Sequence, residues 1–196
     1  MVRIAAVCVY CGSSSGHDPR HTDTALRLGQ RLASEGVELV YGGGAGGLMG
    51  AVADAALAAG GRVVGVLPRG LFDREVPHTG LTALHEVASM HERKQLMVDL
   101  ADAFVALPGG LGTIEELAEV LTWAQLGIHR RPVAVLDETG YWGPLADLLD
   151  RAVDEGFVRP ANRDRLLWVD RVDDLLDVLR AASPAAPEAR LTPEDL

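Results

Sequence analysis

The feature that most constrains this chain is a regular alternation of short apolar runs with longer segments of helical period. Seven runs have the length of buried strands: Ile4–Val9, Val37–Tyr41, Val63–Leu67, Leu84–Val87, Ala103–Leu107, Val133–Leu136 and Leu166–Val169. Six helices are expected among them: Thr22–Ser34, Leu48–Ala59, Met90–Leu100, Gly112–Gly127, Trp142–Glu155 and Val172–Ala182. This order predicts an α/β fold of the Rossmann-like, doubly wound type, with a mostly parallel sheet of about seven strands and helices on both faces.

The 196 residues are enough for one domain with a sizeable core. We expect residues 1–183 to form that single nucleotide-binding domain, and the proline-containing segment 184–196 to be a disordered tail. The long connection from Pro68 to Gly80 is typical of a functional loop. The apolar runs are strand-sized and the N-terminus has no secretory pattern, so we expect a cytoplasmic protein without a membrane partner.

The charge balance argues against a nucleic-acid partner. The net charge is −10, and no basic run is longer than a pair such as Arg130-Arg131, whereas nucleic-acid binding needs a basic surface. An acidic chain can still bind a phosphorylated small molecule through backbone N–H groups. Cys8 and Cys11 form a C-x-x-C, but no second pair completes a four-ligand zinc site, so no metal is expected.

Three glycine-rich loops follow predicted strands: Cys11–Gly16, Gly42–Gly47 and Pro108–Thr113. In doubly wound sheets, ligands bind outside the carboxyl ends of the strands, so we expect these loops to surround a ligand. The third loop opens a helix, whose first N–H groups form an anion site. Ser13 and Ser14 are either simple turn residues or contacts to phosphate or ribose.

The second loop leaves a dinucleotide-binding alternative open. Gly42, Gly44 and Gly47 match G-x-G-x-x-G, which would fit an NADP-dependent oxidoreductase, but the next strand ends in Pro68-Arg69 rather than in an acid. No Walker A sequence is present, and Lys94, the only lysine, leaves one candidate for a pyridoxal phosphate Schiff base. No cofactor is therefore expected.

The third loop and the helix after it carry a family resemblance. The stretch Pro108-Gly109-Gly110-Leu111-Gly112-Thr113-Ile114-Glu115-Glu116 matches the P-G-G-x-G-T-x-x-E motif of the LONELY GUY family. Four other blocks agree in order and spacing: Cys11–Ser14, Tyr41–Gly50, Met90–Lys94 and Thr122–Gly127. The chain resembles this family from about Val2 to Asp170.

The resemblance implies hydrolysis of the N-glycosidic bond of cytokinin nucleoside 5′-monophosphates to a free purine base and ribose 5-phosphate. It implies that Arg93 and Glu116 are the catalytic pair and that the protein is a homodimer. Together with the strand-end loops, it gives these candidate substrate-binding residues: Ser13, Ser14, Gly44, Glu75, Lys94, Gly109, Gly110, Leu111, Gly112, Thr113 and Thr122. The preferred base, whether isopentenyladenine, zeatin or adenine, does not follow from the sequence.

The chemistry of the pair can be argued without the family. N-glycoside hydrolysis passes through an oxocarbenium-like ribose, which a carboxylate can stabilise while it orients the attacking water. Glu116 lies one helical turn after Thr113, so its side chain can lean back toward the loop that would hold the phosphate. Arg93 is permanently charged and can bridge carboxylate and phosphate or steady the departing base.

Each of these residues also has a purely structural interpretation. Thr113 and Glu116 fit a capping box at a helix start, and Arg93 and Lys94 fit an exposed helix face. Glu115 and Glu119 share a face that is typical of a solvated surface. A non-catalytic carrier of a phosphorylated cofactor, of the kind that binds the molybdenum cofactor, would keep the loops without needing Arg93 and Glu116.

Overall fold

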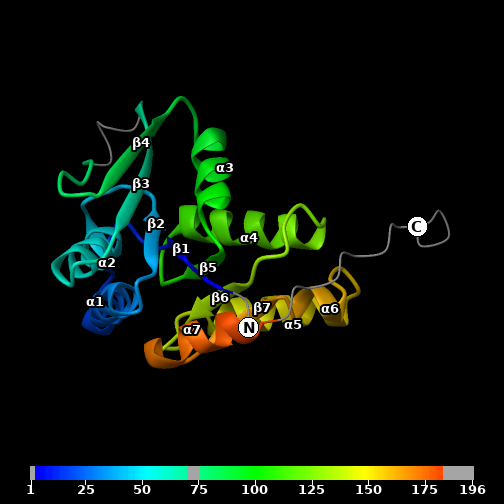
Figure 1. Ribbon diagram of the computed structural model, residues 1–196. Helices are drawn as coiled ribbons and strands as arrows, with labels where there is room; N and C mark the ends of the chain where they lie inside the picture. Colours follow the sequence, from blue (N-terminus) through cyan, green and yellow to red (C-terminus); the bar gives the residue numbers. More distant parts are fainter. Residues whose placement is uncertain (1–2, 70–75, 183–196) are drawn as a thin grey trace.

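A computed structural model describes residues 3–69 and 76–182 (Figure 1). Its single sheet has seven parallel strands in the order β4-β3-β2-β1-β5-β6-β7. The strands are β1 (Ala6–Tyr10), β2 (Glu38–Tyr41), β3 (Val63–Pro68), β4 (Ala83–Val87), β5 (Ala103–Ala106), β6 (Val133–Leu136) and β7 (Leu166–Val169). The helices are α1 (Pro19–Ser34), α2 (Gly47–Ala58), α3 (Met90–Leu100), α4 (Leu111–Gln125), α5 (Gly143–Asp154), α6 (Pro160–Arg163) and α7 (Val172–Ala181).

Two hydrophobic layers hold helices against the two faces of the sheet. Val7 and Val9 of β1 pack with α1, α2 and α7 on one face, whereas Cys8 and Tyr10 pack with α3 and α4 on the other. Successive residues of a strand point to opposite faces, so a strand buried on both sides is apolar throughout. This explains why most predicted strands are continuous apolar runs, whereas the edge strand β4 contains the exposed His85 and Glu86. The arrangement confirms the doubly wound α/β fold.

The strand order places a switch point in the middle of the sheet. The chain runs outward from β1 through β2 and β3 to β4, and then returns to add β5 on the other side of β1. The connections that follow β1 and β5 therefore diverge to opposite faces and leave a crevice between the carboxyl ends of these two strands. The crevice lies between the first and third glycine-rich loops.

Several predicted element ends differ from the structure by a few residues. α1 begins at Pro19 rather than Thr22, because the side chain of Asp18 accepts a 2.9 Å hydrogen bond from the Arg20 N–H and caps the helix. The four-residue helix α6 was not predicted, since one turn carries no amphipathic period. Glu75 and the predicted tail 184–196 lie outside the described residues.

The described end of the Pro68–Gly80 connection binds back to the second glycine loop. The Ala45 N–H donates to the Val76 carbonyl at 2.9 Å, and the His78 N–H donates to the Gly43 carbonyl at 2.9 Å. This connection is therefore tied to the ligand-binding edge of the sheet. Among the described residues, no helix has both the length and the apolar character that crossing a membrane requires.

The most extensive helix–helix contact among the described residues joins α1 and α2, which lie side by side (Figure 1). A Cβ atom added to Gly29 of α1 would lie 2.3 Å from the Val52 carbonyl oxygen and 2.9 Å from the Ala56 nitrogen. Both atoms belong to the backbone of α2, so a clash there cannot be relieved by a side-chain rotation. The two helices can pack this closely only because residue 29 has no side chain.

We predict that Gly29→Ala lowers the free energy of unfolding by about 1–3 kcal/mol, because the added methyl group pushes α2 away from α1. Urea denaturation followed by circular dichroism measures the change. Gly143→Ala is the matched control, since its Cβ meets nothing within 4 Å. The control should change stability by about 0.5 kcal/mol or less, and an equal loss in both variants would contradict the close contact.

Candidate active site

The three glycine-rich loops meet at the carboxyl edge of the sheet. The Gly12 N–H donates to the Pro108 carbonyl at 3.0 Å, and the Leu48 N–H donates to the Gly12 carbonyl at 3.0 Å. The first loop is thus bonded both to the loop after β5 and to the start of α2. The sequence predicted this meeting, because all three loops follow neighbouring strands.

The start of α4 is open to a ligand. Gly110 is its N-cap residue, no side chain caps its first turn, and a Cβ at Gly110 or at Gly112 would meet nothing within 4 Å. The helix dipole makes such an end attractive to an anion, and its first N–H groups are oriented toward one. The capping-box interpretation was wrong, because Thr113 is the third residue of the helix rather than its N-cap.

A cavity of about 370 Å³ opens between α3, α4 and the strand ends. Several predicted site residues line it: Ser13, Arg93, Gly110, Leu111, Gly112, Thr113 and Glu116. A second cavity, of about 480 Å³, adjoins the first, because Gly12, Ser13 and Gly110 line both, and it includes Ser14 and Gly109. Tyr141, which also lines it, donates its hydroxyl hydrogen bond to the Gly109 carbonyl and so fixes this turn.

Arg93 is buried rather than exposed, with only 5% of its surface accessible. It is on α3, and its Nη2 donates to the Gly42 carbonyl at 3.0 Å. A Cβ on Gly42 would lie 2.0 Å from Nη2, so the guanidinium occupies the space that a side chain at residue 42 would take. The interpretation of Arg93 as a charge on an exposed helix face was therefore wrong.

Lys94 is also buried, and it joins α3 to α4. Its Nζ donates to Glu115 at 2.5 Å and to Glu119 at 3.0 Å. Burial alone would lower the pKa of Lys94, but the hydrogen bonds to the two glutamates outweigh it and raise the pKa above the usual value of 10.5. Glu115 is exposed and Glu119 is half-buried, so the interpretation as a solvated face holds for Glu115, but it missed that both glutamates are partners of this lysine. Lys94 does not line the cavity that holds Arg93 and Glu116.

The start of α3 contains a capping pair that the sequence analysis missed. The Ser89 hydroxyl accepts from the Glu92 N–H at 3.2 Å, and the Glu92 carboxylate accepts from the Ala88 N–H at 2.7 Å. The signal was present as Ser89-x-x-Glu92 at the start of a predicted helix. This cap fixes where α3 begins and hence which of its residues turn toward the cavity.

Two further predicted residues lie away from the cavity. Thr122 is exposed near the end of α4, and its hydroxyl donates to the Ala118 carbonyl at 2.7 Å. Gly44 is buried, and its carbonyl accepts from the Tyr41 hydroxyl at 3.2 Å. Neither residue lines the cavity within one chain, and Glu75 lies outside the described residues.

The apolar wall of the cavity was not predicted. It is formed by Val9, Met49, Met90 and Met97. The signal that could have predicted this wall is the i, i+3, i+4, i+7 spacing of one helix face, which relates Met90, Arg93, Lys94 and Met97. Methionine adapts its shape to irregular apolar partners, so this wall can accommodate an apolar group.

Two buried ionisable groups close to Glu116 stay uncharged: Tyr10, which lines the cavity, and Cys8, which does not. Burial raises the pKa of the Cys8 thiol well above its usual range, and the negative charge of Glu116 raises it further. Burial also raises the pKa of Tyr10, with contributions from Cys8 and Glu116. Cys8 therefore stays a thiol rather than a reactive thiolate, and among residues 3–69 and 76–182 no group of three metal-ligating side chains gathers.

Known proteins match most of the length of this chain. A family model described as possible lysine decarboxylase matches residues 49–179. A cytokinin riboside 5′-monophosphate phosphoribohydrolase of Arabidopsis thaliana is 46% identical over 186 residues, which cover 95% of this chain and 86% of that protein. A probable cytokinin riboside 5′-monophosphate phosphoribohydrolase of Oryza sativa subsp. japonica is 51% identical over 161 residues, which cover 82% and 71%.

Solved structures share the fold. The molybdenum cofactor binding protein of Rippkaea orientalis superimposes with a TM-score of 0.69 at 21% identity, over 92% of this chain and 98% of that chain. At this identity the likeness concerns the fold alone.

We predict that Glu115→Gln combined with Glu119→Gln lowers the free energy of unfolding by about 2 kcal/mol at pH 7, because Lys94 then stays buried without a carboxylate. The pKa of Lys94 is raised in the folded protein, so its stabilising pairing is complete below the unfolded-state value near 10.5 and is lost as the pH rises through the folded-state value. The difference from the wild type should therefore shrink above that pH.

Urea denaturation between pH 7 and 11 measures this effect. Glu155→Gln removes one partner of an exposed ion pair with Arg151, so it is the matched control, with an expected change of about 0.5 kcal/mol or less. A loss in the double variant that is no greater than in the control would contradict the buried pairing.

Proposed function

The chain belongs to the LONELY GUY family of cytokinin riboside 5′-monophosphate phosphoribohydrolases, and on that premise we propose that it hydrolyses the N-glycosidic bond of nucleoside 5′-monophosphates. Water adds to C1′ of the ribose, the bond from C1′ to the base nitrogen breaks, and its electron pair leaves with the base, which takes up a proton. The products are a free purine base and ribose 5-phosphate. The observation that carries the proposal is the presence of Arg93 and Glu116 in one cavity with the open start of α4.

The 5′-phosphate binds at the start of α4 in this proposal. Gly110, Leu111, Gly112 and Thr113 supply backbone N–H groups, and the Gly109 turn and Ser13 complete the site. Binding by neutral donors suits a protein of net charge −10, because the charge attraction comes from the helix end rather than from lysines. Ser14 and Gly44 would stabilise the surrounding loops or reach the ribose.

Glu116 acts at the ribose. It lies one turn beyond Thr113 on α4 and lines the same cavity, so a ribose attached to the bound phosphate is close to its carboxylate. The carboxylate stabilises the positive charge that develops at C1′ and orients the attacking water. The buried Tyr10, which lines the cavity, and Cys8 nearby both stay uncharged, so neither adds a negative charge beside the carboxylate.

Arg93 acts between the carboxylate and the phosphate. Its position is set by the Gly42 carbonyl, and its charge offsets the repulsion between Glu116 and a bound phosphate. Lys94, the neighbouring residue, has a different task, because it is engaged by Glu115 and Glu119. Its raised pKa keeps it a protonated ammonium, which is not a Schiff-base nucleophile, so a lysine decarboxylase activity is not favoured.

The base binds against the methionine wall. Val9, Met49, Met90 and Met97 offer an apolar surface to the substituent that distinguishes an isopentenylated or hydroxylated adenine from adenine itself. The relatives named above act on cytokinin riboside 5′-monophosphates according to their names. We therefore propose that a cytokinin monophosphate is preferred over AMP.

A homodimer is the proposed assembly. Large apolar residues on α4 and just after it are exposed, at 86% for Leu111, 41% for Ile114, 66% for Leu126 and 62% for Ile128. A surface of this kind is typical of a subunit interface. Thr122, which faces away from its own cavity, would meet a substrate only across such an interface. A cytoplasmic location is proposed because Cys8 and Cys11, three residues apart in the sequence, are not joined by a disulfide, as is usual in a reducing compartment.

We predict that Glu116→Gln lowers kcat/KM for isopentenyladenosine 5′-monophosphate about hundredfold or more, because Gln carries no negative charge to stabilise the oxocarbenium ion. Arg93→Gln and the smaller change Arg93→Lys should each lower it substantially, with folding verified by circular dichroism. The assay separates free base from substrate by chromatography, with AMP as the second substrate.

Glu155→Gln and Arg62→Gln are the controls, because both residues belong to exposed ion pairs far from the cavity. They should retain wild-type rates. Saturable nucleotide binding without release of base by the wild type would overturn the hydrolase proposal in favour of a carrier.

A separate prediction concerns Gly42→Ala, whose Cβ would lie 2.0 Å from the Arg93 guanidinium. The backbone at Gly42 is not in the left-handed region, so alanine is tolerated there and the effect falls on Arg93. We expect kcat to fall about tenfold to hundredfold with little change in KM, because the guanidinium is displaced while the phosphate site stays intact. Unchanged kcat in a folded variant would show that the position of Arg93 does not matter.

A further inference from the structure

A cavity of about 410 Å³ lies on the opposite edge of the sheet from the candidate active site. We call it the arginine pocket, and these residues line it: Ala124, Arg130, Arg131, Pro132, Val133, Ala161, Asp164, Arg165, Leu167 and Ala182. Val133 is the first residue of β6, and Leu167 is the second of β7. The pocket is thus at the amino ends of these strands, whereas the candidate active site is at carboxyl ends.

The charge of the arginine pocket is opposite to that of the whole chain. Three of its described lining residues are arginines, and Asp164 is the one carboxylate among them, in a protein whose net charge is −10. Guanidinium groups match phosphate oxygens in geometry and can donate two parallel hydrogen bonds to them. A concave site lined in this way concentrates anions.

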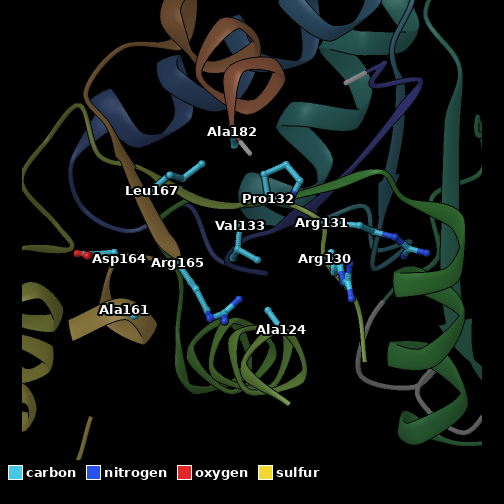
Figure 2. A pocket seen from close by; sticks show the side chains of 10 residues that line it. All are labelled: Ala124, Arg130, Arg131, Pro132, Val133, Ala161, Asp164, Arg165, Leu167 and Ala182. Atoms are coloured by element: carbon cyan, nitrogen blue, oxygen red, sulfur yellow. The ribbon is translucent and has the colours of Figure 1, made fainter. Parts of the chain in front are cut away.

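Two of the three guanidinium groups are held in place by neighbouring groups. The Arg165 Nε donates to the Asn162 side chain at 3.0 Å, and Arg131 donates to the Val98 carbonyl. Figure 2 shows the side chains of Arg165 and Arg130 on either side of Ala124, with Arg131 extending toward α3. Arginines that are already oriented lose less side-chain entropy when they bind a ligand.

His129 lies directly behind the arginines and adds no charge to them. It is buried, one ring nitrogen lies 2.8 Å from the Val120 carbonyl, and the other accepts from the Arg131 N–H at 3.2 Å. Burial lowers the pKa of His129, and the nearby charges of Arg131 and Arg165 lower it further. At neutral pH the positive charge of the pocket therefore comes from the guanidinium groups.

The rest of the lining is apolar and comes mainly from Ala124, Pro132, Val133 and Leu167. The volume is within the range of about 300–1,000 Å³ that is usual for small-molecule sites. An extended polyanion would meet the acidic surface of the rest of the chain, whereas a small ligand would not. We propose that the arginine pocket is a binding site for a small phosphorylated molecule with an apolar body, separate from the candidate active site.

The arginine pocket is built onto the far ends of the two helices that carry the candidate catalytic pair. Arg131 binds the carbonyl of Val98 near the end of α3, and His129 binds the carbonyl of Val120 in α4. Ala124, in the last turn of α4, forms part of the pocket itself. A ligand in the pocket therefore contacts the same two helices that present Arg93 and Glu116 at the other edge of the sheet.

The test is a titration of the ¹⁵N-labelled full-length protein with phenyl phosphate, followed by two-dimensional amide NMR. We expect two separate groups of amide resonances to shift. The first group belongs to residues 110–113 at the candidate active site, and the second belongs to residues 131–133 and 165–167 at the arginine pocket. The double variant Arg130→Gln with Arg165→Gln should weaken binding at the second group by about tenfold or more, and leave the first group unchanged. Inorganic phosphate, which lacks the apolar body, should bind the second group more weakly than phenyl phosphate.

Arg62→Gln is the matched control, because Arg62 is an exposed arginine that pairs with Glu38 just before β3, outside the pocket. It should leave both groups of shifts unchanged. Shifts confined to 110–113 would overturn the proposal, whatever the outcome of the activity assays. Equal weakening by Arg62→Gln would also overturn it, since the binding would then depend on overall charge rather than on the pocket.

Discussion

Two successive buried cations on α3 determine much of the architecture around the cavity. Arg93 and Lys94 are 5% and 7% exposed, and a buried charge is tolerated only where hydrogen bonds and opposite charges compensate for its lost hydration. The partners of Arg93 include the Gly42 carbonyl after β2, and those of Lys94 are Glu115 and Glu119 on α4. One dipeptide therefore joins α3 both to the sheet edge and to α4, and the cavity is the space left where these three elements meet.

The same arrangement reconciles an acidic protein with an anionic substrate. The proposed phosphate site uses the open first turn of α4. The cation proposed to act beside it is Arg93, which binds the Gly42 carbonyl and occupies the space that a side chain at residue 42 would take. The only lysine is held by two glutamates, which favour its protonated form. Arg93 lines the cavity, whereas Lys94 does not line it and is paired with the glutamates. This arrangement does not favour the lysine decarboxylase activity that the description of the family model names.

The fold could be predicted from the sequence because strands buried on both faces are continuous apolar runs. The edge of the sheet that binds the proposed ligand could be predicted because three glycine-rich loops follow strands. What the sequence did not reveal was which charged residue turns inward. Arg93 and Lys94 are adjacent cations on one helix, so the sequence pattern does not distinguish them. Their partners Gly42, Glu115 and Glu119 lie 20 or more positions away in the sequence. Helical spacing alone left the same ambiguity for the three glutamates of α4. Glu115 and Glu116 both line the cavity with Arg93, and Glu115 is the one of these two that pairs with Lys94.

The central claim is that the open start of α4 recognises the 5′-phosphate and so positions the ribose beside Glu116. The most direct test compares kcat/KM for isopentenyladenosine 5′-monophosphate with that for isopentenyladenosine, which lacks only the phosphate. The account predicts that the riboside is hydrolysed about hundredfold or more less efficiently, because several hydrogen bonds to a charged group are lost. Equal efficiency for the two substrates would contradict it, since the helix end would then have no part in the reaction.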